Sequence, residues 1–304
     1  MGKSRGARER VNGVLLLDKP GGMTSNAALQ AVRRLLNAAK AGHTGTLDPM
    51  ATGLLPLTFG EATKFAADLL NADKSYRATL QLGITTRTGD ADGEVISRCD
   101  VAVSSAELDA ALVRFTGAIA QVPPMHSALK RDGQPLYKLA REGTEVERTP
   151  RQITVHQMTL VEHCGDAVVV DIDCSKGTYV RVLAEDIGRA LGCGAHLTAL
   201  RRTRAGRLSV DDAVTLSALE AMSLELRRAR LLPADELLAS LATVRLDDAH
   251  AERFRQGQRL ALDAEPRCER VRVYAGTNEL LGTATISEWG VVEPERLMSN
   301  EKSL

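Results

Sequence analysis

The sequence has 304 residues and is 44% hydrophobic, so the chain is long enough to bury roughly 75% of the surface that it exposes when unfolded. Its 39 basic residues match its 39 acidic residues, which excludes an argument for nucleic-acid binding from net charge alone. No apolar run approaches the roughly 20 residues that cross a membrane, and the N-terminal segment lacks the apolar core of a secretory signal. We therefore expect a globular, cytoplasmic protein with one large and one small domain.

The first part of the chain predicts a strand and a helix that lead into an irregular loop. Residues 1–10 form a basic tail, for which we expect no fixed structure. Residues 13–17 are typical of a short buried strand, and Thr24 or Ser25 is suited to cap the helix that follows. Residues 42–53 contain three Gly, one Pro and three Thr, too irregular for either period. We expect an exposed loop there, and loops often carry catalytic residues.

Strands and helices then alternate around one long insertion. The insertion, at about residues 122–151, is rich in charges and is interrupted by Pro and Gly, and such segments in compact domains are usually functional or disordered. Further strands are predicted at residues 54–58, 76–82, 152–173 and 196–208, and helices at 61–70, 106–115, after 178 and within 216–238. We assign residues 11–242 to the large domain.

The pattern changes near residue 243. Short β-type runs at residues 270–274 and 282–286 are separated by turns at Gly276 and Gly290, with a helix near residues 249–256. We therefore expect a separate, small β-rich domain at residues 243–304.

A local cluster of basic residues favours nucleic-acid binding, although the net charge of the chain is zero. Residues 201–207 contain four arginines, including Arg202, and no acid. A solvated strand edge would explain such a run, but four like charges on one extended segment repel each other unless a polyanion neutralises them. This favours contacts with phosphate groups.

One longer pattern is more specific than any of these features. Asp48-Pro49 alone is a common turn, but residues 42–55 read Gly-x-Thr-Gly-x-Leu-Asp-Pro-x-Ala-x-Gly-x-Leu, and this pattern resembles the catalytic loop of the TruB/dyskerin family of pseudouridine synthases. Further stretches agree in the same order, at residues 18–25, 74–76, 123–130, 176–181 and 200–203. The resemblance implies an α+β pseudouridine synthase fold, with a mixed, largely antiparallel sheet and flanking helices, followed by a small PUA-like domain.

The resemblance also implies catalytic roles for Asp48, Tyr76 and Arg181. Asp48 would be the essential carboxylate and Arg181 its ion-pair partner, while Tyr76 would stack on the target base and is a candidate for proton transfer. Stability alone explains Arg181 poorly, because a cation at the start of a helix opposes the helix dipole. The isomerisation breaks a glycosidic C–N bond and forms a C–C bond without net oxidation or hydrolysis, so we expect no cofactor. The six histidines lack metal-ligand spacing, and we expect no metal.

Substrate-binding roles follow from the same resemblance. The target uridine must leave its RNA loop, and His43 is suited to stack in the gap, although a lone His is often a turn or core residue. Packing is the other interpretation of the tyrosines, and a surface position that of the lysines. The expected binding residues are His43, Tyr76 on the target base, Tyr179 and Leu200 in the uracil pocket, Lys19 supporting the loop, Lys64 near the RNA backbone, and Arg202.

We expect tRNA as the partner, since the sequence is most similar to bacterial members that act on the T-loop uridine. The C-terminal domain would contact the sugar-phosphate backbone of the acceptor stem and would not read its base sequence. We expect that no protein partner is required and that the protein does not bind a membrane. A synthase for another RNA and a non-catalytic RNA-binding or folding module are alternatives. A glycoside hydrolase would need a second carboxylate, and the only other acid in the matched motifs is Asp18. Whether Asp48 attacks the sugar C1′, adds to uracil C6 or stabilises a transient stays open.

Overall fold

The computed structural model describes residues 7–127, 129–131 and 133–299, so residues 1–6 of the expected basic tail lie outside the described part of the chain. The first elements are β1 (Gly13–Lys19), α1 (Ser25–Leu35), β2 (Ala41–His43), β3 (Thr52–Phe59), the 3₁₀ helix η1 (Gly60–Phe65), α2 (Ala66–Leu70), β4 (Lys74–Leu82), β5 (Ile84–Thr86), β6 (Val95–Arg98) and α3 (Ser105–Arg114). Then follow β7 (Gly117–Gln121), β8 (Lys130–Arg131), β9 (Gln134–Pro135), α4 (Leu136–Arg141), β10 (Arg151–Cys164), β11 (Ala167–Cys174), α5 (Val180–Ala190), β12 (Ala195–Ala205) and β13 (Leu208–Ser209). The last are η2 (Val210–Asp212), β14 (Val214–Thr215), α6 (Leu216–Ala221), α7 (Leu224–Ala229), η3 (Ala234–Leu238), β15 (Ala242–Leu246), α8 (Asp248–Arg255), β16 (Leu260–Ala261), β17 (Arg270–Ala275), β18 (Glu279–Ile286) and β19 (Val291–Leu297).

A large mixed sheet forms the centre of the first part of the chain. Its strand order is β14-β1-β3-β12-β4-β11-β10-β7, with β2 paired to β3 and β13 paired to β12. The β1–β14 and β3–β12 pairs are parallel, and the other neighbours are antiparallel. The expected α+β class, with a largely antiparallel sheet and flanking helices, is confirmed.

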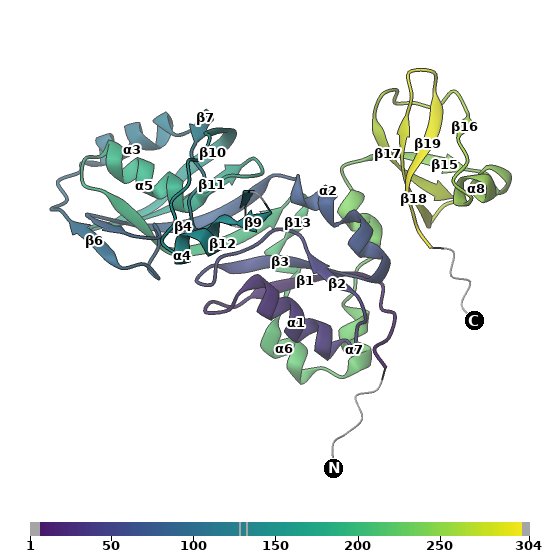
Figure 1. Ribbon diagram of the computed structural model, residues 1–304, viewed down its shortest axis with the longest axis horizontal. Helices are drawn as coiled ribbons and strands as arrows, with labels where there is room; N and C mark the ends of the chain where they lie inside the picture. Colours follow the sequence, from purple (N-terminus) through teal and green to yellow (C-terminus); the bar gives the residue numbers. More distant parts are fainter. Residues whose placement is uncertain (1–6, 128, 132, 300–304) are drawn as a thin grey trace, which may run out of the picture.

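Both faces of the central strands are covered, which explains the continuous apolar run of β1. Leu15 and Leu17 belong to a core cluster that includes residues of α1, α3 and α5, whereas Val14 and Leu16 belong to a second cluster with residues of η1, α2 and η3. Alternate side chains of a strand project to opposite faces, so one strand contributes to both clusters. Figure 1 shows α3 and α5 over the half of the sheet that contains β4 and β11, and α1 and α6 beside β1.

The helix α1, which precedes the loop at residues 42–53, begins where the sequence indicates. The Thr24 hydroxyl accepts a hydrogen bond from the Ala27 backbone N–H and so caps α1. Ser25 has a different function, because its hydroxyl bonds the backbone of Leu47 in the loop. Adjacent residues therefore start the helix and attach the loop to it.

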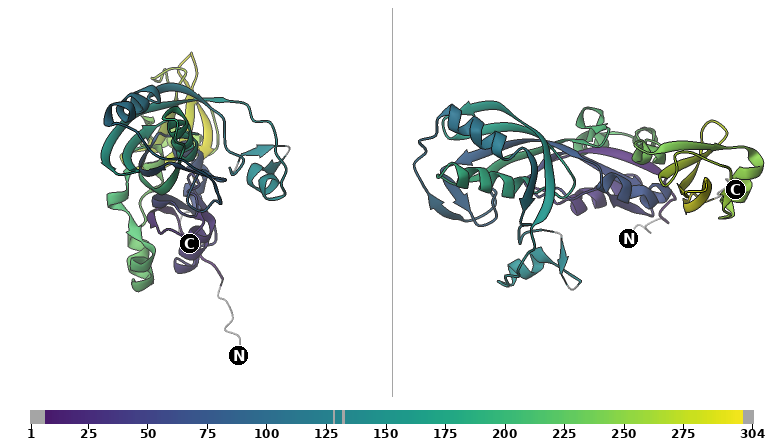
Figure 2. Two further views of the ribbon diagram at one scale, coloured as in Figure 1. Left: turned by 90° about the vertical axis from the view of Figure 1, so that its left-hand side faces the viewer. Right: turned by 90° about the horizontal axis from the view of Figure 1, so that it is seen from above.

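The long insertion connects the edge strand β7 to its neighbour β10. Within it, β8 and β9 form a short hairpin and α4 is a short helix. Figure 2 shows this hairpin and helix standing out from the body of the large domain.

The C-terminal part forms its own sheet, in the order β15-β17-β18-β19-β16. Its apolar core is separate from the other two clusters and includes Phe254 of α8, Val273 and Ile286, all fully buried. Arg270 joins it to the large domain through an ion pair with Asp68 of α2. Figure 1 shows this β-rich domain at one end of the molecule, which confirms the expected β-rich character of the C-terminal region.

Two segments differ from the expectation in detail. Residues 61–70 form η1 followed by α2 instead of one α-helix, because apolar side chains spaced three or four apart fit either helix type. The loop at residues 42–53 is only partly exposed, since Thr44, Leu47 and Ala51 are buried and anchor it to the core.

Leu80 on β4 tests the packing of the central sheet. Its side chain is 1% exposed in the large core cluster, so Leu80→Ala is expected to lower the free energy of unfolding of the large domain by about 2–5 kcal/mol. Leu226→Ala on α7, where the side chain is 59% exposed, serves as the control and should change it by less than about 0.5 kcal/mol. Denaturant unfolding measures both variants, and equal effects would contradict this account of the core.

Candidate active site

The loop between β2 and β3 is held by hydrogen bonds to its backbone and by close packing where it enters β3. The Ser25 hydroxyl donates to the Leu47 carbonyl (3.0 Å) and accepts from the Leu47 N–H (2.8 Å). Gly53, where the loop enters β3, has φ +96°, and a Cβ there would lie 2.3 Å from the Arg202 carbonyl of the parallel strand β12. Only glycine fits this position. The loop is therefore a fixed platform for the residue that follows Leu47.

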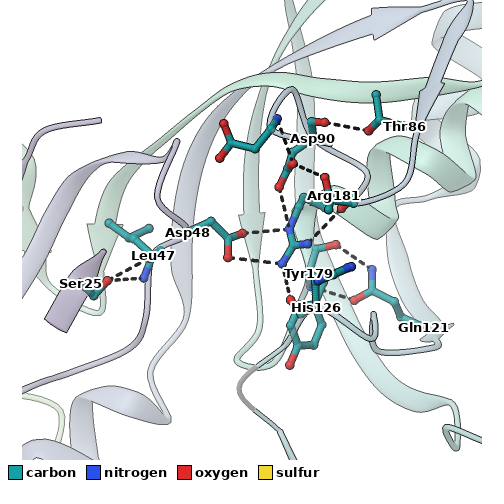
Figure 3. Close-up of polar contacts among 11 residues, drawn as sticks. Ser25, Leu47, Asp48, Thr86, Asp90, Gln121, His126, Tyr179 and Arg181 are labelled. Carbon is teal, nitrogen blue, oxygen red and sulfur yellow. Dashed lines mark hydrogen bonds and ion pairs between the residues drawn. The ribbon is translucent and has the colours of Figure 1, made fainter. Parts of the chain in front are cut away.

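That residue, Asp48, forms a two-pronged ion pair with Arg181 (Figure 3). Arg181 Nε donates to Asp48 Oδ2 (2.9 Å), and Nη2 donates to Oδ1 (3.3 Å). The side chain of Arg181 is 6% exposed, whereas that of Asp48 is 34% exposed. The carboxylate thus lies between a buried cation and solvent, so a substrate can approach it. The structure brings these two expected catalytic residues together.

Arg181 also forms a second, longer ion pair and two further hydrogen bonds. Asp90, in the loop after β5, lies 3.6 Å from Arg181 Nε, and Arg181 also donates to the carbonyls of Thr88 (3.0 Å) and His126 (2.8 Å). Asp90 is itself fixed, since the Thr88 hydroxyl and the Asp92 N–H donate to its carboxylate. Sequence reasoning missed Asp90 because Thr, Gly and Asp in a polar loop are typical of ordinary turns.

Burial governs the acidity of the carboxylate. It raises the pKa of Asp48 above its ordinary value of 3.8, the Arg181 guanidinium opposes that rise, and Asp90 adds to it. A carboxylate that is poorly solvated but held ionised by one cation is basic and reactive for its type. The arrangement is suited to attack on, or charge stabilisation at, an electrophilic carbon.

Aromatic and apolar side chains lie around this pair. Tyr76 on β4 is half-buried and belongs to the same apolar cluster as Leu47 and the buried Leu200 of β12. Tyr179 immediately precedes α5, two residues before Arg181, and is also half-buried. Burial raises the pKa of both phenols, so both are protonated at neutral pH. A flat, neutral ring with a polar tip fits a planar base.

Two buried lysines donate to backbone carbonyls, Lys19 beneath the loop and Lys74 beneath the end of α2. Lys19 is fully buried, and its Nζ donates to backbone carbonyls, those of Pro20 (2.8 Å), Met23 (2.6 Å) and Pro49 (3.3 Å). Lys74, 8% exposed, likewise donates to the carbonyls of Leu69, Leu70 and Ala72. Burial lowers the pKa of each ammonium to about 8. Within the described residues neither forms an ion pair with a carboxylate.

Arg202 lies beneath the loop and not on an open surface. Its side chain is 1% exposed, Nε donates to the Leu54 carbonyl (2.7 Å) and Nη2 donates to the Gly45 carbonyl (3.2 Å). The expectation that the four arginines of residues 201–207 contact phosphate groups did not anticipate this, because alternate residues of a strand face opposite sides. Arg202 therefore braces the loop and β3.

The two remaining expected binding residues lie in different places. His43 ends β2 at the start of the loop, and burial followed by Arg202 lowers its pKa, so its ring is neutral at neutral pH. Its Nδ1 is buried without a hydrogen-bond partner in the described part of the protein. Lys64 instead lies at the contact between the domains, where it bonds Glu61 (2.6 Å) and the Leu297 carbonyl (2.9 Å).

The described residues contain no group of three or more His, Cys, Asp or Glu side chains that could hold a metal ion. Among them there is also no helix long and apolar enough to cross a membrane.

Comparisons with known proteins match most of the chain. A family model described as TruB family pseudouridylate synthase (N terminal domain) matches residues 33–180. Models described as tRNA pseudouridylate synthase B C-terminal domain and as Pseudouridine synthase II TruB, C-terminal, match residues 181–239 and 242–298.

Curated relatives extend over nearly the full length of the chain. It is 57% identical over 302 residues to tRNA pseudouridine synthase B of Burkholderia mallei, covering 97% of each protein. It is 56% identical to the protein of that name from Aromatoleum aromaticum, covering 97% of this chain and 95% of the relative. Among solved structures, a chain of a Cbf5-Nop10-Gar1 complex is similar with a TM-score of 0.73 and 27% identity, covering 94% of this chain and 84% of that one. A chain of an H/ACA RNP bound to a substrate RNA containing 2'-deoxyuridine also gives 0.73, at 25% identity, covering 95% and 86%.

The lowered pKa of Lys19 predicts a pH-dependent stability. Because that pKa is about 8 in the folded protein and 10.5 ordinarily, the unfolded chain binds more protons between these values, and the contribution of Lys19 to stability rises with pH there. Between about pH 8 and pH 10.5, the free energy of unfolding of wild type should increase relative to that of Lys19→Met, because folding releases up to one proton from Lys19 in this range. Denaturant unfolding at a series of pH values measures the gap between wild type and Lys19→Met. A gap that stays constant with pH would contradict the lowered pKa of Lys19.

Proposed function

Because the chain belongs to the TruB family of pseudouridine synthases, we propose that it is an isomerase that converts a uridine of tRNA to pseudouridine. The proposal rests on relatives that are 54–57% identical and are named tRNA pseudouridine synthase B. The observation that carries it is the Asp48–Arg181 pair, formed by residues of two family motifs 133 positions apart in sequence.

The reaction needs a group that attacks or stabilises an electrophilic carbon, and a carboxylate is suited to this role. The glycosidic C–N bond of the uridine breaks, the uracil turns, and its C5 joins the sugar while the C5 proton is lost and N1 gains one. We assign Asp48 as the essential carboxylate, because its side chain is partly exposed and its two oxygens are held by a buried cation. Arg181 keeps it ionised and oriented, since two hydrogen bonds fix the plane of the carboxylate.

The surrounding side chains support a role in holding the base. Tyr76 and Leu200 present apolar surface in the cluster behind the loop, and Tyr179 begins the helix that carries Arg181. We assign Tyr76 to stacking on the uracil and to proton transfer, and Tyr179 and Leu200 to the walls of its pocket. Exclusion of water by these groups strengthens the electrostatic interaction with Asp48.

For the substrate we propose the T-stem-loop of tRNA. A uridine in a folded loop must flip out to reach Asp48, and neutral His43, at the start of the same loop, is suited to stack in its place. We assign Lys19 and Arg202 to support of the loop and Lys64 to the RNA backbone near the domain contact. No cofactor or protein partner is needed for this assignment.

For the β-rich region we propose a PUA-like domain at residues 243–304 that contacts the acceptor stem, following a catalytic domain at residues 11–242. The domain lies at one end of the molecule, held to α2 by Arg270 and Asp68, so an RNA helix running from the active site to this end would touch both domains. We also propose that the protein acts in the cytoplasm, where tRNA is modified.

Asp48→Asn tests the function directly. Tritium release from C5-labelled uridine in a T-stem-loop hairpin should fall at least about 10³-fold, because the isosteric amide cannot act as a carboxylate. Asp166→Asn, in the exposed β10–β11 turn, is the matched control and should release tritium like wild type. Undiminished release by Asp48→Asn would overturn the assignment, and no release by wild type would overturn the proposed substrate.

Arg181→Lys separates catalysis from binding. Lysine keeps the charge but loses the planar fork that holds both oxygens of Asp48, so kcat should fall by about 10²-fold or more while the affinity for the hairpin changes by less than about threefold. Single-turnover rates and equilibrium binding measure the two quantities. Equal losses in both would identify Arg181 as mainly a binding residue.

A further inference from the structure

The long insertion leaves and rejoins the sheet at a single pair of residues. Gln121, the last residue of β7, is opposite Arg151, the first residue of β10. Arg148 on the returning arm donates to the Pro123 carbonyl on the outgoing arm (3.1 Å) and ties the two arms together. The base of the insertion is therefore a fixed stem, and Gln121 lies at its inner end.

The side chain of Gln121 faces the backbone of Tyr179 (Figure 3). Its Nε2 donates to the Tyr179 carbonyl (3.1 Å), and its Oε1 accepts from the Tyr179 N–H (2.8 Å). The residue is 3% exposed. One amide thus pairs with both backbone groups of a single residue, as a neighbouring strand would, across 58 positions of sequence.

This clamp acts at the start of α5. Tyr179 is the N-cap residue of α5, and its own side chain makes no capping hydrogen bond. The Tyr179 carbonyl also accepts the first helical bond, from the Leu183 N–H (3.1 Å). By fixing that carbonyl, Gln121 sets the position of the first turn of α5, which carries Arg181.

The same arm makes a second contact five residues later. The His126 carbonyl accepts a hydrogen bond from Arg181 Nη2 (2.8 Å), on the guanidinium that holds Asp48. The segment from Gln121 to His126 therefore holds the backbone before Arg181 and the end of its side chain. A shift of this segment changes the direction from which Arg181 meets the carboxylate.

We propose that Gln121 is a positioning residue for the reaction, which couples the stem of the insertion to Tyr179 and Arg181. This inference rests on the proposed function. Gln121 acts through other residues, and its loss removes the two hydrogen bonds that fix the Tyr179 backbone and so frees the Arg181 fork to shift. A misplacement of about 1 Å costs catalysis up to about 10²-fold, whereas RNA affinity depends on many contacts and changes little.

Gln121→Met tests the proposal, because methionine nearly keeps the volume and removes both hydrogen bonds. The single-turnover rate on a T-stem-loop hairpin should fall about 10- to 100-fold, with hairpin affinity within about threefold of wild type. Gln121→Glu keeps the acceptor for the Tyr179 N–H but places a carboxylate against the Tyr179 carbonyl, so its rate should be no higher than about a tenth of wild type. Hydrogen exchange at the Tyr179 amide, which needs no activity, should be faster in Gln121→Met.

The control is Gln152→Met, an exposed glutamine next to Arg151 on β10, which should match wild type in every readout. A wild-type rate in Gln121→Met, or equal losses of rate and affinity, would overturn the positioning role while leaving the proposed function intact. If Gln121→Met unfolds, exchange and rate in Gln121→Glu decide the matter. An inactive wild type would instead contradict the proposed function, and unchanged exchange at Tyr179 would then still count against the clamp.

Discussion

The buried guanidinium of Arg181 is the constraint on which the site depends. A cation that is 6% exposed must find acceptors in the protein, and it finds them in three segments that are far apart in sequence. The loop after β2 supplies Asp48, the loop after β5 supplies Asp90 and the Thr88 carbonyl, and the insertion supplies the His126 carbonyl. Folding these segments around one charge is what assembles the active site.

The same principle explains how an electrically neutral chain presents a site suited to a polyanion. Lys19 and Arg202 are buried beneath the loop and Lys74 is buried beneath the end of α2, and the donors of all three go to carbonyl oxygens. Carbonyls satisfy the hydrogen bonds without cancelling the charge. The positive charge near the loop therefore persists, although acids elsewhere on the surface balance it in the total.

Sequence predicted the parts of this site that lie within local patterns. Asp48 and Arg181 belong to long motifs, and the helix that begins after Thr24 follows ordinary capping rules. Asp90 and Gln121 could not be found in this way, because a turn-type aspartate and a glutamine at a strand end have no local signal, and their partners lie 91 and 58 positions away. The orientation of Arg202 was equally hidden, since only the register with β3 decides which face of β12 is buried.

The place where the insertion joins the sheet has a consequence for how such enzymes vary. β7 is the edge strand, so the insertion connects two neighbouring antiparallel strands, and within the described residues its β8–β9 hairpin forms a sheet of its own. Doubling the length of such a loop costs only about 0.6 kcal/mol in closure entropy. The hairpin and α4 can therefore vary in length at little cost to folding, provided that residues 121–126, which contact Tyr179 and Arg181, are kept.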